Sequence, residues 1–262
     1  MPKGRLLLGK IPVLITGGMG MVGRLLLDDL HRDHQVRATG RSVPDLIKDA
    51  PPPGVDEFLQ GDLRDPRFAN RAVAGADAVI HLAANASPVS SVAEAMGNVE
   101  IAANVLDAAA RAGVKNVVIA SSVHASGLDY RDGISGISPA HPPRPCCPYG
   151  AGKVAVEGLA RLHQDEMGNS VSCLRLGLVG WPLEEREYAH TWLSAGDMRA
   201  LVRAALTARA GFGIYHGVSR DAATRWDTGN AREDLGWVPF DHWAKEVGEL
   251  PLAKKSSCRL LK

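Results

Sequence analysis

Three polar side chains in the middle of the sequence have the types and spacing needed to move a proton at a substrate oxygen. Tyr149 and Lys153 are four positions apart in a helix-like stretch, so they share one face, and Ser122 ends an apolar run upstream. A nearby ammonium favours phenolate over phenol, so we expect Lys153 to lower the pKa of Tyr149 from about 10. We predict that all three are catalytic, with Tyr149 as the base, Lys153 tuning it, and Ser122 at the same substrate oxygen.

A glycine-rich turn near the start of the chain suits a dinucleotide pyrophosphate, which needs unshielded backbone N–H groups and the positive end of a helix dipole. Gly17 would make the tight turn, Gly20 would let the backbone approach the phosphates, and Gly23 would let the helix pack closely. A glycine turn without a ligand is the alternative, but the strand before it and the helix after it favour the site. The predicted pyrophosphate segment comprises Gly17, Met19, Gly20, Met21, Val22 and Gly23.

The end of the second predicted strand distinguishes NADP from NAD. An NAD site usually has a carboxylate there, whereas this strand ends in Gly40-Arg41-Ser42 and the nearest acid, Asp45, follows a proline. A guanidinium and a hydroxyl suit a 2′-phosphate, so the sequence favours NADP, with NAD as the alternative.

The ends of the next two predicted strands supply the remaining cofactor residues. Asp62 is placed to accept the adenine amino group, with Leu63 against the ring; a turn aspartate or helix cap is the alternative. The segment Leu82, Ala83 and Ala84 would line the nicotinamide ribose and pyrophosphate. Tyr149 and Lys153 are also expected to contact the cofactor, the lysine at its ribose.

Short β-branched runs alternate with longer amphipathic ones over the first 180 residues. Such alternation predicts parallel strands joined by right-handed helical crossovers, and hence an α/β fold with a doubly wound parallel sheet of the Rossmann type. The predicted strands are 12–16, 35–39, 56–60, 78–82, 116–121 and 171–176, and the predicted helices are 23–33, 67–74 and 98–112.

The rhythm changes after about residue 180. Ser194 is expected to cap a helix over 195–208, and 213–218 is expected to return to the sheet as a strand. We therefore expect a single Rossmann-type domain over 1–262, with a dinucleotide-binding core at 10–180 and a small helical substrate lobe at 181–262.

Composition excludes several classes of partner. The 30 basic and 29 acidic residues leave a formal charge of +1, which gives no reason to expect nucleic acid or an anionic membrane. No apolar run approaches the roughly 20 residues that span a bilayer, and the N-terminal leucine stretch is interrupted too soon for a signal peptide. We expect a cytoplasmic protein that acts on a small molecule.

The four cysteines, Cys146, Cys147, Cys173 and Cys258, show no metal-ligand spacing. We expect reduced thiols and no metal site. Trp192 and the helix after Ser194 could belong to a homo-oligomer interface or to ordinary core.

Several motifs together resemble the extended short-chain dehydrogenases/reductases of the NAD-dependent epimerase/dehydratase type, over nearly the whole chain. They are the glycine turn, Gly61-Asp62-Leu63, His81-Leu82-Ala83-Ala84, Ser121-Ser122, Tyr149-x-x-x-Lys153 and Leu174-Arg175-Leu176-Gly177. The downstream motifs, such as His190-Thr191-Trp192-Leu193-Ser194 and Tyr215-His216-Gly217-Val218-Ser219, are similar to uronate dehydrogenases. That resemblance implies oxidation of a uronate at C1 to a lactone with NAD.

The same resemblance implies substrate contacts from Ser122, Ser87 and Arg186. His124 alternates with Ser122 and could reach the same pocket, with a satisfied histidine near the core as the alternative. The chain departs from the family pattern here: Val123 replaces a polar residue, Ala86 precedes Ser87, and the arginine for the carboxylate aligns with Glu187, beside Arg186. We therefore predict an NAD(P)-dependent oxidoreductase that interconverts a hydroxyl and a carbonyl on a small polar, sugar-like substrate. A nucleotide-sugar epimerase or dehydratase and a non-catalytic NADP-sensing module are the alternatives.

Overall fold

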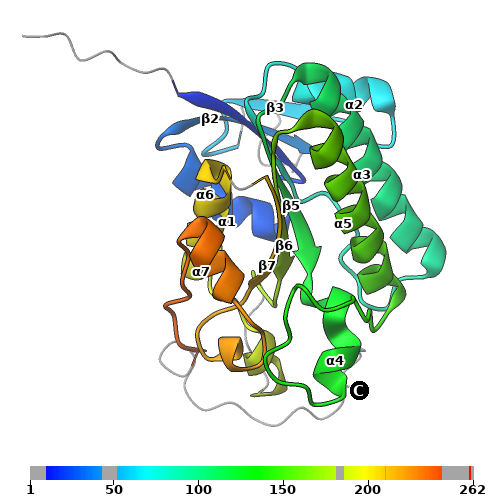
Figure 1. Cartoon of the computed structure of the whole chain (residues 1–262). Helices are drawn as coiled ribbons and strands as arrows, with labels where there is room; N and C mark the ends of the chain where they lie inside the picture. Colours follow the sequence, from blue (N-terminus) through cyan, green and yellow to red (C-terminus); the bar gives the residue numbers. More distant parts are fainter. Residues whose placement is uncertain (1–9, 43–51, 181–185, 210, 244–259, 261–262) are drawn as a thin grey trace, which may run out of the picture.

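The computed structural model describes residues 10–42, 52–180, 186–209, 211–243 and 260, and it is built around one parallel sheet (Figure 1). The strand order is β3-β2-β1-β4-β5-β6-β7, with every neighbouring pair parallel. The strands are β1 (Ile11–Thr16), β2 (His34–Gly40), β3 (Glu57–Gln60), β4 (Ala78–His81), β5 (Asn116–Ser122), β6 (Ser170–Leu176) and β7 (Phe212–Gly217). The chain reverses its winding between β1 and β4, where open α/β sheets bind their ligands.

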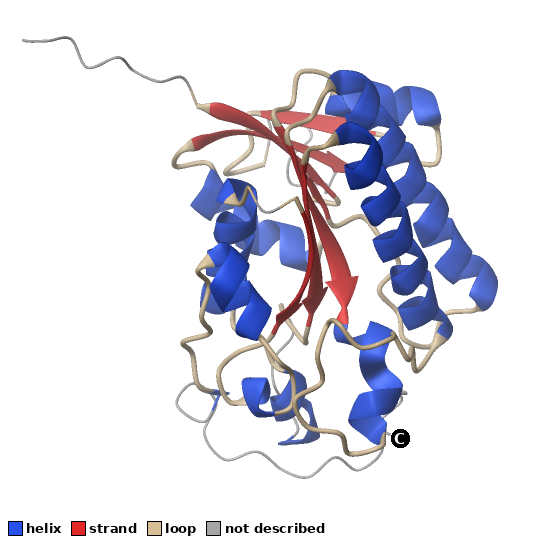
Figure 2. Ribbon diagram, viewed as in Figure 1, coloured by secondary structure: helices blue, strands red, loops and turns tan. Residues whose placement is uncertain are grey.

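Helices cover both faces of the sheet (Figure 2). On one face lie α2 (Pro66–Val73), α3 (Val92–Ala112) and α5 (Pro148–Met167); on the other lie α1 (Met21–Leu30), α6 (Ala195–Thr207) and α7 (Gly229–Leu235). Strands β4, β5 and β6 are nearly continuous runs of buried residues because they have a helical layer on both sides. This doubly wound arrangement confirms the predicted fold class.

Local capping explains where the helices begin. Ser194 caps α6 as expected, since its side chain accepts a hydrogen bond from the Asp197 N–H at 2.8 Å. The prediction that the third helix begins at Asn98 was wrong: α3 begins at Val92, after a capping box formed by Ser91 and Glu94. The box satisfies two backbone donors that would otherwise lack partners, which extends the helix by almost two turns.

The residues after 180 contribute to the sheet and to the helical layer that carries α1. Met198 and Leu201 of α6 and the ring of Trp237 join the core beneath α1, and β7 completes the sheet edge. Trp192 is 6% exposed, so within the chain it is a packed residue. The domain boundary near residue 180 stays a prediction.

A second, smaller core lies beyond the carboxyl ends of β5–β7. It joins Val123 and Tyr149 from the β5–α5 region to Val218 and Trp226 from the C-terminal region. The β5–α5 connection carries two short helical segments that the sequence did not predict, η2 (Val123–Ser126) and α4 (Gly127–Arg131). This satellite core supports the residues around Tyr149.

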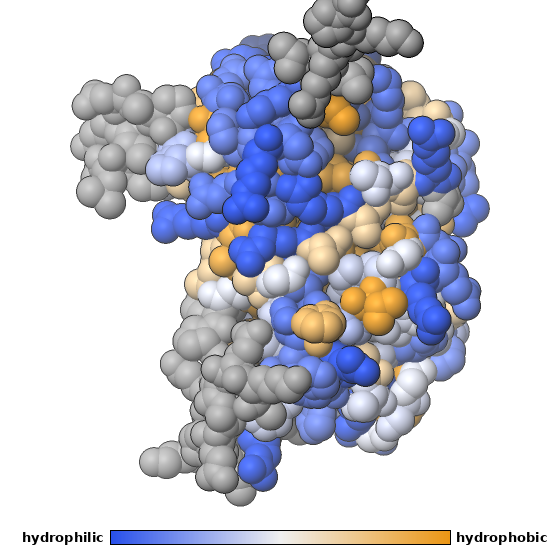
Figure 3. Space-filling model, turned by 90° about the vertical axis from the view of Figure 1, so that its left-hand side faces the viewer, coloured by the Kyte–Doolittle hydropathy of each residue, from blue (hydrophilic) through white to orange (hydrophobic). Residues whose placement is uncertain are grey.

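Polar groups cover most of the face that carries α1, α6 and α7, with hydrophobic groups in separate patches (Figure 3). In the part of the chain that the structure describes, no helix combines the length and the apolar character required to cross a membrane.

Candidate active site

The glycine turn between β1 and α1 offers backbone donors to an anion. Gly17 has a positive φ of 67°, and a Cβ there would lie 2.9 Å from the backbone of Ala83. A Cβ on Gly23 would lie 2.4 Å from the Gly18 carbonyl oxygen, so this glycine allows α1 to pack against the turn. Gly20 precedes the helix without a side-chain cap, and the first turn of α1 carries no acidic residue. The backbone N–H groups in the first turn of α1 therefore suit a pyrophosphate.

A cleft of about 850 Å³ opens at this turn, within the range of about 300–1,000 Å³ usual for ligand sites. Its walls come from the turn and from the loops after β2, β3 and β4. Of the predicted cofactor residues, the walls include Gly17, Met19, Gly20, Gly40, Arg41, Ser42, Asp62, Leu63, Leu82, Ala83 and Ala84. Met21, Val22 and Gly23 belong to the first turn of α1 and are not wall residues. The size, the glycine cradle and the uncapped helix together fit a dinucleotide.

The end of β2 presents a cation and a hydroxyl to this cleft. Arg41 and Ser42 are both exposed wall residues, and the Gln60 side chain donates a hydrogen bond to the Arg41 carbonyl oxygen at 3.1 Å. The acidic residues of the wall are Asp62, in the loop after β3, and Glu94, in the first turn of α3. Asp45 lies outside the described residues.

The loop after β3 places a carboxylate in the cleft, already paired. Asp62 accepts hydrogen bonds from the Arg64 backbone N–H at 2.9 Å and from the Arg64 Nε at 3.0 Å. These hydrogen bonds lower the pKa of Asp62. An adenine amino group at this carboxylate would share it with Arg64 or displace the guanidinium. The role predicted for Asp62 is untested, and the sequence analysis missed Arg64.

Ser122, Tyr149 and Lys153 meet at the ends of β5 and α5. The Ser122 hydroxyl lies near enough to the Tyr149 phenol to favour its ionised form, and the Lys153 Nζ donates to the Ala120 carbonyl oxygen at 2.6 Å. The same Nζ lies 5.6 Å from the centroid of the Tyr149 ring. The three do not line the cleft, but β5 pairs directly with β4, whose following residues do. The structure thus brings together the three side chains that the spacing selected.

Burial dominates the electrostatics of this trio. Tyr149 and Lys153 are 8% and 4% exposed. Loss of solvent raises the pKa of Tyr149 to about 12, although the hydrogen bond from Ser122 acts in the opposite direction. Loss of solvent also lowers the pKa of Lys153 to about 8. The expected lowering of the tyrosine pKa is therefore not found in the protein alone, because desolvation of the phenolate is the largest influence on it.

A buried ion pair between Glu157 and Arg175 stabilises the position of the trio. Glu157 lies one turn after Lys153, and its two carboxylate oxygens accept hydrogen bonds from Arg175 of β6, each at 2.8 Å. Ser121 also donates to Glu157 at 2.6 Å, and Arg175 donates to Ser126 at 2.8 Å. The network ties β5, β6 and α5 together, and it makes Ser121 the buried strand-end hydroxyl that its position suggests.

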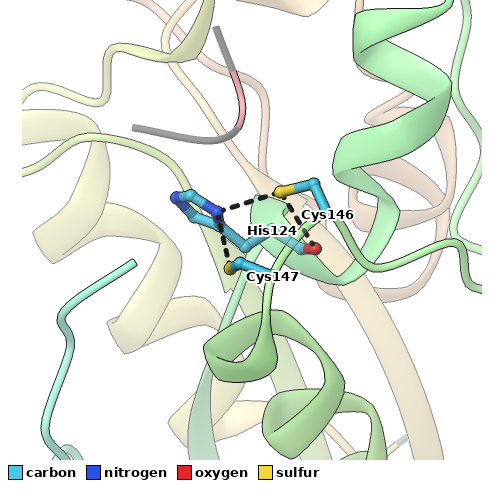
Figure 4. A group of neighbouring side chains, drawn as sticks. All are labelled: His124, Cys146 and Cys147. Carbon is cyan, nitrogen blue, oxygen red and sulfur yellow. Dashed lines mark hydrogen bonds between the residues drawn. The ribbon is translucent and has the colours of Figure 1, made fainter. Parts of the chain in front are cut away.

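His124, predicted to contact substrate, faces two cysteines (Figure 4). Its Nδ1 lies 3.2 Å from the Sγ of Cys146 and 3.4 Å from that of Cys147, and its ring meets Tyr149 edge-on. Cys147 is the N-cap residue of α5. Hydrogen bonds from Cys146, from His124 and from the Gly150 N–H lower the pKa of Cys147 to about 4, against the effect of its partial burial.

The other two predicted substrate residues, Ser87 and Arg186, lie on segments that do not carry the trio. Ser87 is half-buried in the loop after β4, where its N–H donates to the Asn85 side chain at 3.2 Å. Arg186 is exposed at the start of η3 (Arg186–Thr191). Residues 181–185, directly before it, lie outside the described residues. Both substrate assignments stay predictions.

The sequence analysis missed Asn98, which holds the loop after β4 where it lines the cleft. Asn98 is 5% exposed on α3; its side chain accepts from the Asn85 N–H at 2.7 Å and donates to the Asn85 carbonyl oxygen at 2.9 Å. A buried asparagine on an apolar helix face is the signal that could have identified it, because buried amides require partners.

The doubly wound sheet, the glycine turn and the cleft at its switch point define a dinucleotide-binding protein. Residues 13–238 match the NAD dependent epimerase/dehydratase family. The chain belongs to this family, and within it to the extended short-chain dehydrogenases/reductases, a class of enzymes.

Curated relatives and solved structures agree with this membership. The chain is 32% identical to uronate dehydrogenase of Pseudomonas syringae pv. tomato, over 87% of this chain and 82% of the relative. It is 30% identical to NAD-dependent glucose-6-phosphate dehydrogenase of Haloferax volcanii, over 89% and 95% of the two chains. A tyrosine-to-alanine variant of uronate dehydrogenase from Agrobacterium tumefaciens, in complex with NAD, has a TM-score of 0.80 and 26% identity, covering 95% of this chain and 93% of its own.

Proposed function

We propose that this protein oxidises a hydroxyl group of a small, sugar-like substrate to a carbonyl, with NADP or NAD as the hydride acceptor. The observation that carries the proposal is the grouping of Ser122, Tyr149 and Lys153 where β5 ends and α5 begins, beside a dinucleotide-sized cleft. Relatives that act on uronates and on a sugar phosphate support a sugar-like substrate. The finer proposal is oxidation of a uronate at C1 to its lactone.

The residues of this chain divide the work as follows. When bound, the oxidised nicotinamide accepts hydride and adds a positive charge to the site. Tyr149 takes the hydroxyl proton at its phenolic oxygen, and Ser122 hydrogen-bonds the substrate oxygen and the tyrosine. Lys153, still largely protonated at pH 7 with its pKa of about 8, keeps a cation beside the phenol. Because burial and the neighbouring Cys147 raise the pKa of Tyr149 to about 12, the phenol acts as a base only with the positive charges of Lys153 and of the bound nicotinamide beside it.

The test is formation of reduced nicotinamide, followed by absorbance, with glucuronate, galacturonate, glucose 6-phosphate and a simple secondary alcohol. Each compound is assayed with NAD and with NADP. Tyr149→Phe is expected to lower kcat by about 10²- to 10⁴-fold, the usual contribution of a positioned acid or base. Tyr215→Phe is the matched control, because this buried phenol hydrogen-bonds Asp234 on the far side of β7. Oxidation that survives Tyr149→Phe would remove the proposed mechanism.

The cofactor preference has its own test. We propose that Arg41 favours NADP, since a guanidinium in the cleft wall can bind a 2′-phosphate. Arg41→Ala is expected to lower kcat/KM for NADP about tenfold, equivalent to about 1.4 kcal/mol, and to change the value for NAD less than about twofold. An equal loss of kcat/KM with both cofactors would show that Arg41 does not bind the 2′-phosphate.

A further inference from the structure

Three side chains with nitrogen and sulfur donors converge beside Tyr149, although they come from two separate segments (Figure 4). His124 belongs to η2 after β5, whereas Cys146 and Cys147 immediately precede α5. The Nδ1 and the two Sγ atoms all lie within 4.8 Å of one another. Both cysteines are buried and the histidine is half-buried. Two thiols and an imidazole favour zinc over cations that prefer oxygen ligands.

The observed spacing is close to that of a tetrahedral site. Zinc binds thiolate sulfur at about 2.3 Å and histidine nitrogen at about 2.0–2.1 Å, so a tetrahedral angle separates the two donors by about 3.5 Å. In this protein the Nδ1 lies 3.2 Å from one Sγ and 3.4 Å from the other. Both nitrogen–sulfur distances are therefore within a few tenths of an ångström of the tetrahedral value.

The backbone holds the donors in place. The Cys146 N–H donates to the His124 carbonyl oxygen at 3.3 Å, and the Gly150 N–H donates to the Cys147 Sγ at 3.4 Å. A Cβ on Gly150 would lie 2.3 Å from that same carbonyl oxygen, so only glycine lets α5 approach η2 this closely. The two ligand-bearing segments are thus fixed together before any ion binds, which reduces the ordering that binding requires.

We propose that His124, Cys146 and Cys147 bind one thiophilic divalent cation of the Zn²⁺ type, with the fourth coordination position open. Two adjacent cysteines alone do not indicate a metal site in the sequence. The third donor comes from a residue more than twenty positions away, and only the packing of α5 against η2 supplies it.

The test uses the full chain, reduced with a non-thiol phosphine and titrated with Co²⁺ as a spectroscopic substitute for Zn²⁺. We expect one equivalent of Co²⁺ to produce thiolate-to-cobalt charge-transfer absorption, and one equivalent of Zn²⁺ to abolish it. Cys146→Ser and Cys147→Ser are expected to lose the band; serine at 147 can still cap α5, so the fold is preserved. Cys173→Ala, which removes a buried thiol in β6, is the control and should keep the band.

Two outcomes would overturn the site: no charge-transfer band in the parent protein, or a band of equal strength in both serine variants. Thermal unfolding with and without Zn²⁺ provides a second readout, because a ligand that binds only the folded state raises Tm. Zn²⁺ should raise the Tm of the parent and the Cys173→Ala variant but of neither serine variant.

The position of the site suggests a consequence, which rests on the proposed function. The His124 ring lies 5.7 Å from the Tyr149 ring, and Cys147 is two residues before Tyr149. Bound Zn²⁺ is therefore expected to lower turnover at least severalfold in the parent, with full recovery after chelation. Inhibition that persists in Cys147→Ser would overturn this consequence. If no substrate turns over, the Co²⁺ spectrum still decides whether the site exists.

Discussion

Two arginine–carboxylate pairs lie at the carboxyl edge of the same sheet, and they differ most in their access to water. The Arg64 and Asp62 side chains, in the cofactor cleft, are 55% and 37% exposed, whereas those of Arg175 and Glu157, behind the catalytic trio, are 1% and 5% exposed. Solvent screens the first pair, so it contributes little to stability and its carboxylate stays accessible to a ligand. The second pair is desolvated, so losing either partner leaves a buried charge. The cleft can rearrange around a ligand, whereas the catalytic end is fixed in advance.

The largest expected effect comes from breaking the buried pair. Glu157→Leu should lower the free energy of unfolding by about 3–5 kcal/mol, because the Arg175 guanidinium would remain buried, with the Ser126 hydroxyl as its remaining hydrogen-bond partner among the described residues. Denaturant unfolding measures the change. The double variant Glu157→Leu/Arg175→Met is the control and should recover much of the loss. A change below about 1 kcal/mol in the single variant would remove the contrast between the two pairs.

A smaller effect is expected from His81, a buried residue whose protonation makes the free energy of unfolding depend on pH. Burial lowers the pKa of His81, which hydrogen-bonds Thr16 at 2.8 Å, to about 3. The unfolded chain binds a proton at this residue below about pH 6.5 while the folded chain does not, so stability falls as the pH falls from about 6.5 toward 3. Between about pH 5.5 and 4.5, His81→Asn should reduce the pH slope of the unfolding free energy by about 1.4 kcal/mol per pH unit.

The slope, rather than the stability at one pH, is the quantity to compare, because it cancels the constant cost of losing the Thr16 hydrogen bond. Equal slopes in the two proteins would mean that His81 is protonated in the fold. The buried histidine would then titrate as an exposed histidine does.

The smallest expected effect on stability is at the exposed pair. Asp62→Asn should change the free energy of unfolding by less than about 1 kcal/mol, as expected for a solvent-screened ion pair. The same variant should raise the Kd of the cofactor about fivefold, equivalent to one lost hydrogen bond of about 1 kcal/mol. Equilibrium unfolding and cofactor fluorescence titration measure the two quantities. A large loss of stability with unchanged cofactor binding would reverse the roles that we assign to the two pairs.

Local spacing predicted much of the fold and the pairing of the proposed catalytic residues. The helical face shared by Tyr149 and Lys153 depends only on the four-residue interval. The glycine turn could be identified because the strand before it and the helix after it are continuous in sequence. The start of α3 was missed because an apolar period does not show a capping box, and Asn98 was missed because its partner is a backbone loop in front of the helix.

The sequence by itself determined the parallel sheet, the glycine turn and the two residues of the proposed catalytic helix, since each follows from residues close together in the chain. Only the tertiary structure decided the rest. Packing α5 against η2 brought His124 to Cys146 and Cys147, and packing it against β6 paired Glu157 with Arg175. Burial also reversed the expected shift of the Tyr149 pKa, because the cost of desolvating a charge depends on everything packed around it.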